Sequence, residues 1–119
     1  MKIGVIGCGA VGSYYGAKLG HSGQEVHFLL RSDYETVRRK GVLIRSAEGD
    51  FRFHPKCART PEEIGVCDLV LIAIKSTANE ALAKLLSPMV GKSTAVLTLQ
   101  NGLGNEEVLA KLVGTEKVL

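Results

Sequence analysis

Residues 4–16 read GVIGCGAVGSYYG and contain five glycines. The stretch begins inside a short apolar run, residues 2–6 (KIGVI), and continues beyond its end. Within this stretch Gly7, Gly9 and Gly12 have the GxGxxG spacing that lets a strand turn tightly into a helix. Such a turn can cradle a pyrophosphate or can be purely structural, and the spacing alone does not separate the two. Its position between a strand pattern and a helix pattern is the one that binding requires, which favours a dinucleotide site.

The residues of this turn have distinct expected tasks. Gly7 would permit the tight turn, Gly9 would let the backbone approach a pyrophosphate, and Gly12 would let helix and strand pack closely. Gly12, Gly16 and Gly20 are spaced four residues apart, so they share one face of the helix predicted for residues 10–21. We expect this face to pack on the sheet. The candidate cofactor-binding residues of the turn are Gly7, Cys8, Gly9, Ala10, Val11 and Gly12.

Further strands and helices alternate along the chain. Apolar runs without alternation are typical of strands buried on both faces of a parallel sheet. They occupy residues 25–30, 69–74 and 95–99. Capping boxes at Thr60-Pro61-Glu62-Glu63 and Thr77-Ala78-Asn79-Glu80 open helices, the second running to Ser87-Pro88, and a third helix is predicted for residues 105–113. The order predicts an α/β fold, a Rossmann-type doubly wound, mostly parallel sheet with helices on both faces.

Two features depart from a simple repeat. Residues 42–46 (VLIRS) and 51–54 (FRFH) flank residues 47–50 (AEGD) and predict a small inserted β-hairpin after the second strand. Residues 114–119 (GTEKVL) look like a turn entering another strand, so we expect residues 1–119 to form one domain of a longer protein.

Composition narrows the functional classes. A chain of 119 residues fits one domain, and its 45% hydrophobic and 23% charged residues are ordinary for a globular protein. The net charge of +3 is too small to suggest nucleic acid as a partner. The one basic cluster, Arg38-Arg39-Lys40, is explained more simply as the solvated end of a short helix than as a phosphate site.

The sequence also predicts no membrane partner, because no apolar run approaches the ~20 residues of a bilayer span, and no signal peptide. The cysteines Cys8, Cys57 and Cys67 lack metal-ligand spacing and are expected to be reduced thiols. A cytoplasmic location is therefore expected.

Arg31 bears on the choice of dinucleotide. An NAD site usually has an acidic residue at the end of the second strand, whereas here the strand ends in Phe28-Leu29-Leu30-Arg31. A guanidinium can make paired, charge-assisted hydrogen bonds to a 2′-phosphate, which favours NADP(H). Ser32 is a second candidate, as the cap of a helix whose N-terminus would face that phosphate, or as a cap alone. Two observations weigh against NADP(H). Arg31 could instead be a surface arginine that pairs with Asp33 or Glu35, and the Asp33 carboxylate is unfavourable near a phosphate but not near the ribose hydroxyl of NAD.

Polar residues also follow the two later strands. Lys75 comes after residues 69–74, and Gln100-Asn101-Gly102 follows residues 95–99. Because ligands lie at the carboxyl ends of the strands in open α/β sheets, these residues are candidates for contacts with the cofactor or the substrate. A lysine at a strand end is often merely solvated, and it is the combination that suggests a site.

In these features the chain resembles the amino-terminal domain of the ketopantoate reductases (2-dehydropantoate 2-reductases). The resemblance rests on GVIGCGAVGSYYGAKL, the strand ending in Arg31, the hairpin, Lys75 after DLVLIAI, and LQNGLGNEE. It implies NADPH-dependent reduction of a 2-keto acid, ketopantoate, to pantoate on the route to coenzyme A. It further implies that Lys75 contacts the cofactor and that Asn101 lies between the nicotinamide and the substrate. The family's general acid belongs to a helical carboxyl-terminal domain, so no catalytic residue is expected in this chain.

Other functions remain as alternatives. A stand-alone regulatory nucleotide-sensing domain would fit 119 residues, although it would be expected to keep an acidic residue where Arg31 stands. A related keto-acid reductase of another substrate, or another two-domain NADP dehydrogenase, would share the same fold. An open sheet edge invites pairing, so a dimer of residues 1–119 through such an edge would be unsurprising. A homodimer of the full-length protein is a separate expectation.

Overall fold

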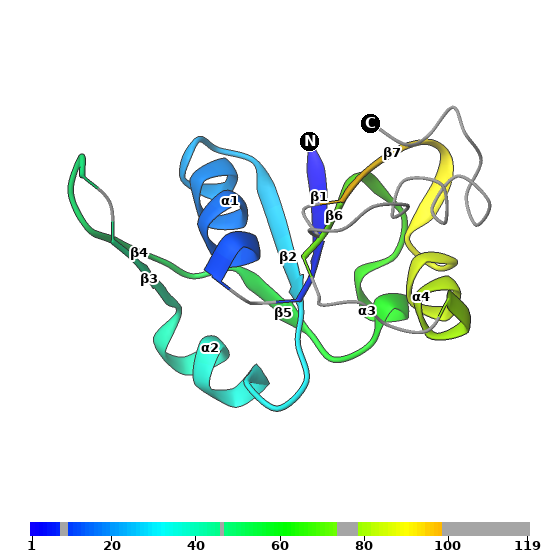
Figure 1. Cartoon of the computed structure of the whole chain (residues 1–119), viewed down its shortest axis with the longest axis horizontal. Coiled ribbons are helices and arrows are strands. Elements are labelled where there is room, and N and C mark those ends of the chain that lie inside the picture. Colours follow the sequence, from blue (N-terminus) through cyan, green and yellow to red (C-terminus); the bar gives the residue numbers. More distant parts are fainter. Residues whose placement is uncertain (8–9, 46, 74–78, 99–119) are drawn as a thin grey trace.

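The computed structural model describes residues 1–7, 10–45, 47–73 and 79–98, which form four helices and seven strands (Figure 1). In chain order these are β1 (Lys2–Ile6), α1 (Ala10–His21), β2 (Glu25–Leu29), α2 (Tyr34–Lys40), β3 (Val42–Ile44), β4 (Phe51–Phe53), β5 (Lys56–Ala58), α3 (Pro61–Ile64), β6 (Cys67–Ile72), α4 (Asn79–Leu86) and β7 (Val90–Thr98). None of the helices within these ranges is long and apolar enough to cross a membrane.

Five of the strands form one sheet in the order β5-β2-β1-β6-β7, and all four neighbouring pairs are parallel. The remaining two, β3 and β4, pair with each other in an antiparallel hairpin. From the central strand β1 the chain first adds β2 and β5 toward one edge of the sheet. It then returns to the other side of β1 and adds β6 and β7 toward the opposite edge. The predicted doubly wound α/β fold with an inserted hairpin is therefore confirmed, and its strand order reverses between β1 and β6.

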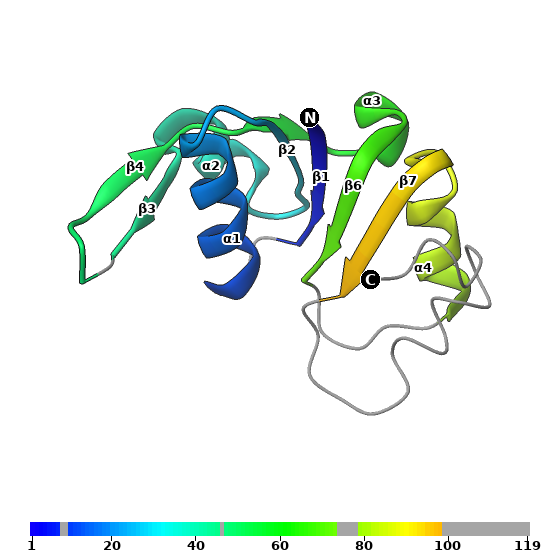
Figure 2. The same ribbon diagram turned by 90° about the horizontal axis from the view of Figure 1, so that it is seen from above.

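The sheet is covered on both faces, because successive side chains of a strand point to opposite sides. In β1, Ile3 and Val5 belong to a buried cluster that includes Val37 of α2 and contacts Leu19 of α1. Ile6 belongs to a second cluster, with Ile64 of α3 and with Leu82 and Leu86 of α4. Figure 2 shows α1 and α4 on opposite sides of the central strands. Burial on both faces explains why these strands are apolar throughout instead of alternating.

The glycine face of α1 packs closely, as predicted, but not against the sheet alone. A Cβ on Gly12 would lie 2.7 Å from Cβ of Ala73, the residue after β6, and one on Gly16 would lie 2.6 Å from Cε1 of Phe28 in β2. Gly20 faces the ring of Phe53 in β4 instead. The glycine face therefore packs α1 against the sheet at its amino end and against the hairpin at its carboxyl end.

The predicted strand boundaries shift, and one strand was missed. β2 ends at Leu29 instead of residue 30, and β6 spans residues 67–72 instead of 69–74. The missed strand is β5, which adds to the outer edge of β2 with Phe28 paired to Cys57. Three residues that change from exposed to buried are too few to form a recognisable pattern.

The last strand of the sheet, β7, begins at Val90, five residues before the predicted start, because its pairing with β6 is irregular. Cys67 pairs with Val90, yet Leu69 pairs with Ala95, so the intervening part of β7 bulges away from its neighbour. Thr94, only 3% exposed, holds this bulge. Its hydroxyl donates to the Cys67 carbonyl oxygen at 2.5 Å and accepts from the Gly91 backbone N–H at 2.8 Å.

The helix starts were predicted with mixed success. Thr60 caps α3 in a capping box with Glu63 and with Pro61 in the first turn, as predicted. The second predicted helix appears as α4, which ends at Leu86. The cap at Thr77, the helix predicted for residues 105–113 and the strand predicted near residues 114–119 lie outside the described residues.

Candidate functional site

The candidate site lies at the carboxyl edge of the sheet, where the strand order reverses. Because β1, β2 and β6 are parallel, the residues that follow them reach the same edge: Gly7, Leu30 with Arg31, and Ala73. The Ala73 backbone N–H donates to the Ile6 carbonyl oxygen at 2.9 Å, which holds the ends of the two central strands together. This is the place where open α/β sheets bind ligands.

Gly7 begins the turn out of β1 in a conformation that favours glycine. Its φ of +99° lies in the region that residues with a Cβ rarely adopt. The start of α1 is close by, since a Cβ on Gly12 would lie 3.2 Å from the Gly7 carbonyl oxygen. The structure thus brings Gly7 and Gly12 together in the tight turn that the motif predicted. Ala10 and Val11 belong to the first turn of α1, whereas Cys8 and Gly9 lie outside the described residues.

Arg31 and Ser32 are exposed in the turn that joins β2 to α2. The Tyr34 backbone N–H donates to the Arg31 carbonyl oxygen at 3.2 Å and closes this turn. The predicted cap at Ser32 is wrong: the N-cap of α2 is Asp33, and it makes no side-chain capping hydrogen bond. With φ −93° and ψ 4°, Asp33 lacks the extended backbone from which a capping side chain reaches back to the helix.

The acidic neighbours of Arg31 do not bind it. Glu35, one of its two expected partners, pairs instead with Arg59, whose Nη2 lies 2.9 Å from Glu35 Oε1. Within the described part of the chain, Arg31 makes no ion pair with Asp33 or any other carboxylate. Its guanidinium is therefore available at the tip of β2.

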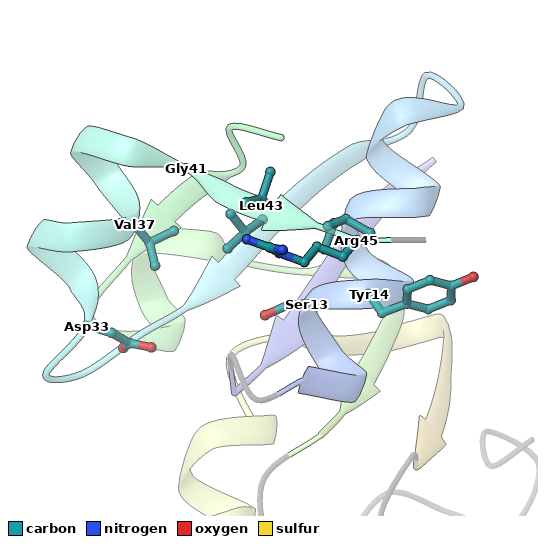
Figure 3. A pocket seen from close by; sticks show the side chains of 9 residues that line it. Ser13, Tyr14, Asp33, Val37, Gly41, Leu43 and Arg45 are labelled. Atoms are coloured by element: carbon teal, nitrogen blue, oxygen red, sulfur yellow. The ribbon is translucent and has the colours of Figure 1, made fainter. Parts of the chain in front are cut away.

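A groove of about 550 Å³ opens beside this turn, between α1, α2 and β3 (Figure 3). Four lining side chains carry polar groups: Ser13 and Tyr14 of α1, Asp33 of the turn, and Arg45, which follows β3. Figure 3 shows the Ser13 hydroxyl directed to the side where Asp33 lies and the Arg45 side chain extending toward Leu43. Arg45 has no recognisable signal in the sequence, because only the folding back of the hairpin brings it to α1 and α2.

Two groups with shifted pKa values, Glu25 and Cys67, lie at the opposite edge of the sheet, where β2 and β6 begin. A hydrogen bond from His27, with help from the charge of Lys56, lowers the pKa of Glu25. Burial raises the pKa of the Cys67 thiol. Both shifts therefore belong to the structure of the sheet and not to the candidate site. Searching the described ranges, we find no group of His, Cys, Asp and Glu side chains that could hold a metal ion.

Four of the predicted site residues cannot be placed. Lys75, Gln100, Asn101 and Gly102 lie outside the described residues. They follow β6 and β7, whose ends point to the same edge of the sheet as Gly7 and Arg31.

The all-parallel sheet, its reversal between β1 and β6 and the positive-φ glycine at the end of β1 define the class of this chain, a Rossmann-type α/β domain. Residues 3–119 match the family described as "Ketopantoate reductase PanE/ApbA". This chain belongs to the ketopantoate reductase family.

Individual relatives agree with this assignment. The 2-dehydropantoate 2-reductase of Nostoc sp. is 46% identical over 117 residues, which cover 94% of this chain and 35% of that protein. The crystal structure of 2-dehydropantoate 2-reductase from Geobacter metallireducens GS-15 is similar with a TM-score of 0.93 and 51% identity, over 99% of this chain and 40% of that one. A ternary structure of D-mandelate dehydrogenase with NADH and anilino(oxo)acetate has a TM-score of 0.85 and 26% identity, over 99% of this chain and 39% of that one. The chain thus spans 35% to 40% of the length of these relatives.

Proposed function

We propose that residues 1–119 form the NADP(H)-binding domain of a cytoplasmic 2-dehydropantoate 2-reductase, which reduces ketopantoate to pantoate. The observation that carries the cofactor choice is the exposed Arg31 at the tip of β2, without a carboxylate partner among the described residues. An NAD site would hold the ribose hydroxyls with an acidic side chain at this place. The substrate is supported by the names of the Nostoc and Geobacter relatives.

The described residues fit a dinucleotide. The positive φ of Gly7 and the close packing at Gly12 form the tight turn into α1 at which a pyrophosphate would bind. Arg31 would bind the 2′-phosphate through two parallel N–H donors, and Ser32 would lie beside it with its hydroxyl. When bound, NADPH supplies the hydride for the keto carbon.

The remaining candidates complete the proposal. Lys75, Gln100 and Gly102 would line the cofactor side of the edge, and Asn101, with a donor and an acceptor, would lie between the nicotinamide and the keto acid. None of these residues is assigned as the acid that protonates the developing alkoxide. We assign that step to the part of the protein that this chain does not include.

The test is a titration of the purified chain with NADPH and NADH, which differ only in the 2′-phosphate. Charge-assisted hydrogen bonds contribute about 1.5–3 kcal/mol each, so the loss of even one of them in Arg31→Ala should weaken NADPH binding by at least roughly 10- to 100-fold. It should change the Kd of NADH by less than about threefold. Arg38→Ala, an exposed arginine in the last turn of α2, is the matched control and should change neither value.

Equal affinity of the unchanged chain for the two cofactors, or a uniform loss in Arg31→Ala, would refute the assignment of Arg31. The first result would also support the second candidate, a reductase of another keto acid that uses NADH. That candidate is favoured by the likeness to D-mandelate dehydrogenase, whose structure holds NADH. Assays of the whole protein with ketopantoate and with the keto acid of mandelate would then decide between the substrates.

A further inference from the structure

Arg59 leaves the sheet next to Arg31, although the two are far apart in the sequence. It follows β5, which is the neighbour of β2, and the Leu30 backbone N–H donates to the Ala58 carbonyl oxygen at 2.9 Å. The residues after these two, Arg31 and Arg59, therefore start from adjacent strand ends. An arginine at this position is close to the proposed 2′-phosphate site without being part of the glycine motif or of the β2 tip.

The Arg59 guanidinium makes two contacts with the segment that follows Arg31. It donates to Glu35 Oε1 at 2.9 Å, and it lies 4.3 Å from the centre of the Tyr34 ring. Tyr34 in turn closes the turn through its backbone hydrogen bond to the Arg31 carbonyl oxygen. Arg59 thus holds the far end of the turn that carries Arg31 and Ser32, and it compensates the charge of Glu35.

Stability does not explain this arrangement well. The side chains of Arg59 and Glu35 are 59% and 57% exposed, and ion pairs this exposed contribute little to the free energy of unfolding. An uncompensated carboxylate near a bound phosphate, in contrast, repels it at low ionic strength. The pair therefore matters most when a phosphate is bound nearby.

We propose that Arg59 is a positioning residue for 2′-phosphate recognition, which acts by neutralising Glu35 and by fixing the turn that presents Arg31. This inference rests on the proposed NADPH binding. Arg59 acts through Glu35 and Tyr34 and is not itself assigned a contact with the cofactor.

The experiment measures the Kd of NADPH and of NADH for the unchanged chain, Arg59→Gln, Glu35→Gln and the double variant. The quantity compared is the ratio of the two Kd values, which isolates the 2′-phosphate. Arg59→Gln should lower the preference for NADPH about fivefold in low salt, and the effect should shrink in 0.5 M NaCl because screening weakens the repulsion. The double variant should recover the preference to within about twofold, since it removes the carboxylate as well.

Lys56→Gln is the matched control, because Lys56 lies on the same strand β5 but at its amino end, where it pairs with Glu25 at 3.7 Å. The ratio of the NADPH and NADH Kd values for Lys56→Gln should equal that of the unchanged chain. If Arg59→Gln fails to fold by circular dichroism, Glu35→Gln alone decides, since leaving the Arg59 charge uncompensated should raise the preference about twofold or more.

The outcomes separate the two proposals. An unchanged chain with no preference for NADPH would overturn the proposed function. A preference for NADPH that Arg59→Gln leaves unchanged, or a loss in Arg59→Gln that the double variant does not restore, would overturn the role of Arg59 while leaving the proposed function intact.

Discussion

At the scale of single residues, glycines at two places of this domain are required for different reasons. Gly7 needs a positive φ, so its conformation excludes most other residues. Gly16 has an ordinary helical backbone, and the limit there is space. A Cβ at Gly16 would lie 2.6 Å from Cε1 and 2.8 Å from Cζ of Phe28 and 3.2 Å from Cγ2 of Val5.

Gly16→Ala should therefore destabilise the domain, although alanine is the better helix former. Phe28 and Val5 are both 0% exposed, so their side chains cannot move aside into solvent. Overpacking of this kind costs about 1–3 kcal/mol, against a gain of roughly 1 kcal/mol in helix propensity. We expect a net loss of up to about 2 kcal/mol in the free energy of unfolding, measured by urea denaturation.

Gly20→Ala is the comparison for this prediction. Its new methyl group would meet Phe53 of the hairpin, which is only partly buried and can shift, so the loss should be smaller. A Gly16→Ala variant as stable as the unchanged chain would show that α1 is not held against β2 by this contact.

At the scale of elements, β7 shows how one side chain can define a strand. Between Val90, which pairs with Cys67, and Ala95, which pairs with Leu69, β7 has four residues where β6 has one. Thr94 ties this bulge to β6 through one hydroxyl, which both donates and accepts. The strand therefore continues across a bulge instead of ending there.

Thr94→Val should lower the free energy of unfolding by about 1–3 kcal/mol, because it keeps the shape but leaves the Cys67 carbonyl and the Gly91 N–H without this partner. Thr94→Ser keeps the hydroxyl, so its free energy of unfolding should fall by less. Chemical denaturation of the two variants side by side measures the difference. If valine is tolerated as well as serine, the bulge does not depend on the hydroxyl.

At the scale of the whole molecule, the chain divides into a sheet buried on both faces and a hairpin attached to one side. The hairpin strands β3 and β4 pair only with each other in the described structure. Its outer end contacts α1 through His21, whose ring centre lies 4.7 Å from that of Phe51, and through Lys18, 3.6 Å from Glu48. These contacts are few compared with those of the central strands.

Amide hydrogen exchange should reveal this division. Amides of β1 and β6 lie between two neighbouring strands under two layers of side chains and should exchange only with global unfolding. Amides of β3 and β4 should exchange at least about tenfold faster. His21→Ala should accelerate amide exchange in the hairpin further and leave the exchange of β1 unchanged. Equal protection of the hairpin and the sheet would contradict this division.

The sequence by itself determined the features that depend on a few neighbouring residues. The turn at Gly7, the capping box at Thr60 and four of the five parallel strands were predicted, because a missing Cβ, a side-chain cap and an unbroken apolar run act locally. The site residues Lys75, Gln100, Asn101 and Gly102 remain predictions. The Ser32 cap failed, because α2 begins one residue later than predicted, with Asp33 at the N-cap position.

Only the tertiary structure decided the contacts between distant segments. β5 becomes a strand because β2 offers an unpaired edge, and only then does Arg59 reach Glu35, 24 residues away. The bond from Thr94 to Cys67 spans 27 residues and likewise depends on β6 and β7 being neighbours. The conformational preferences of turns and helix caps depend on adjacent residues and can be recognised in the sequence. These long-range contacts, in contrast, form only once the order of the strands in the sheet is set.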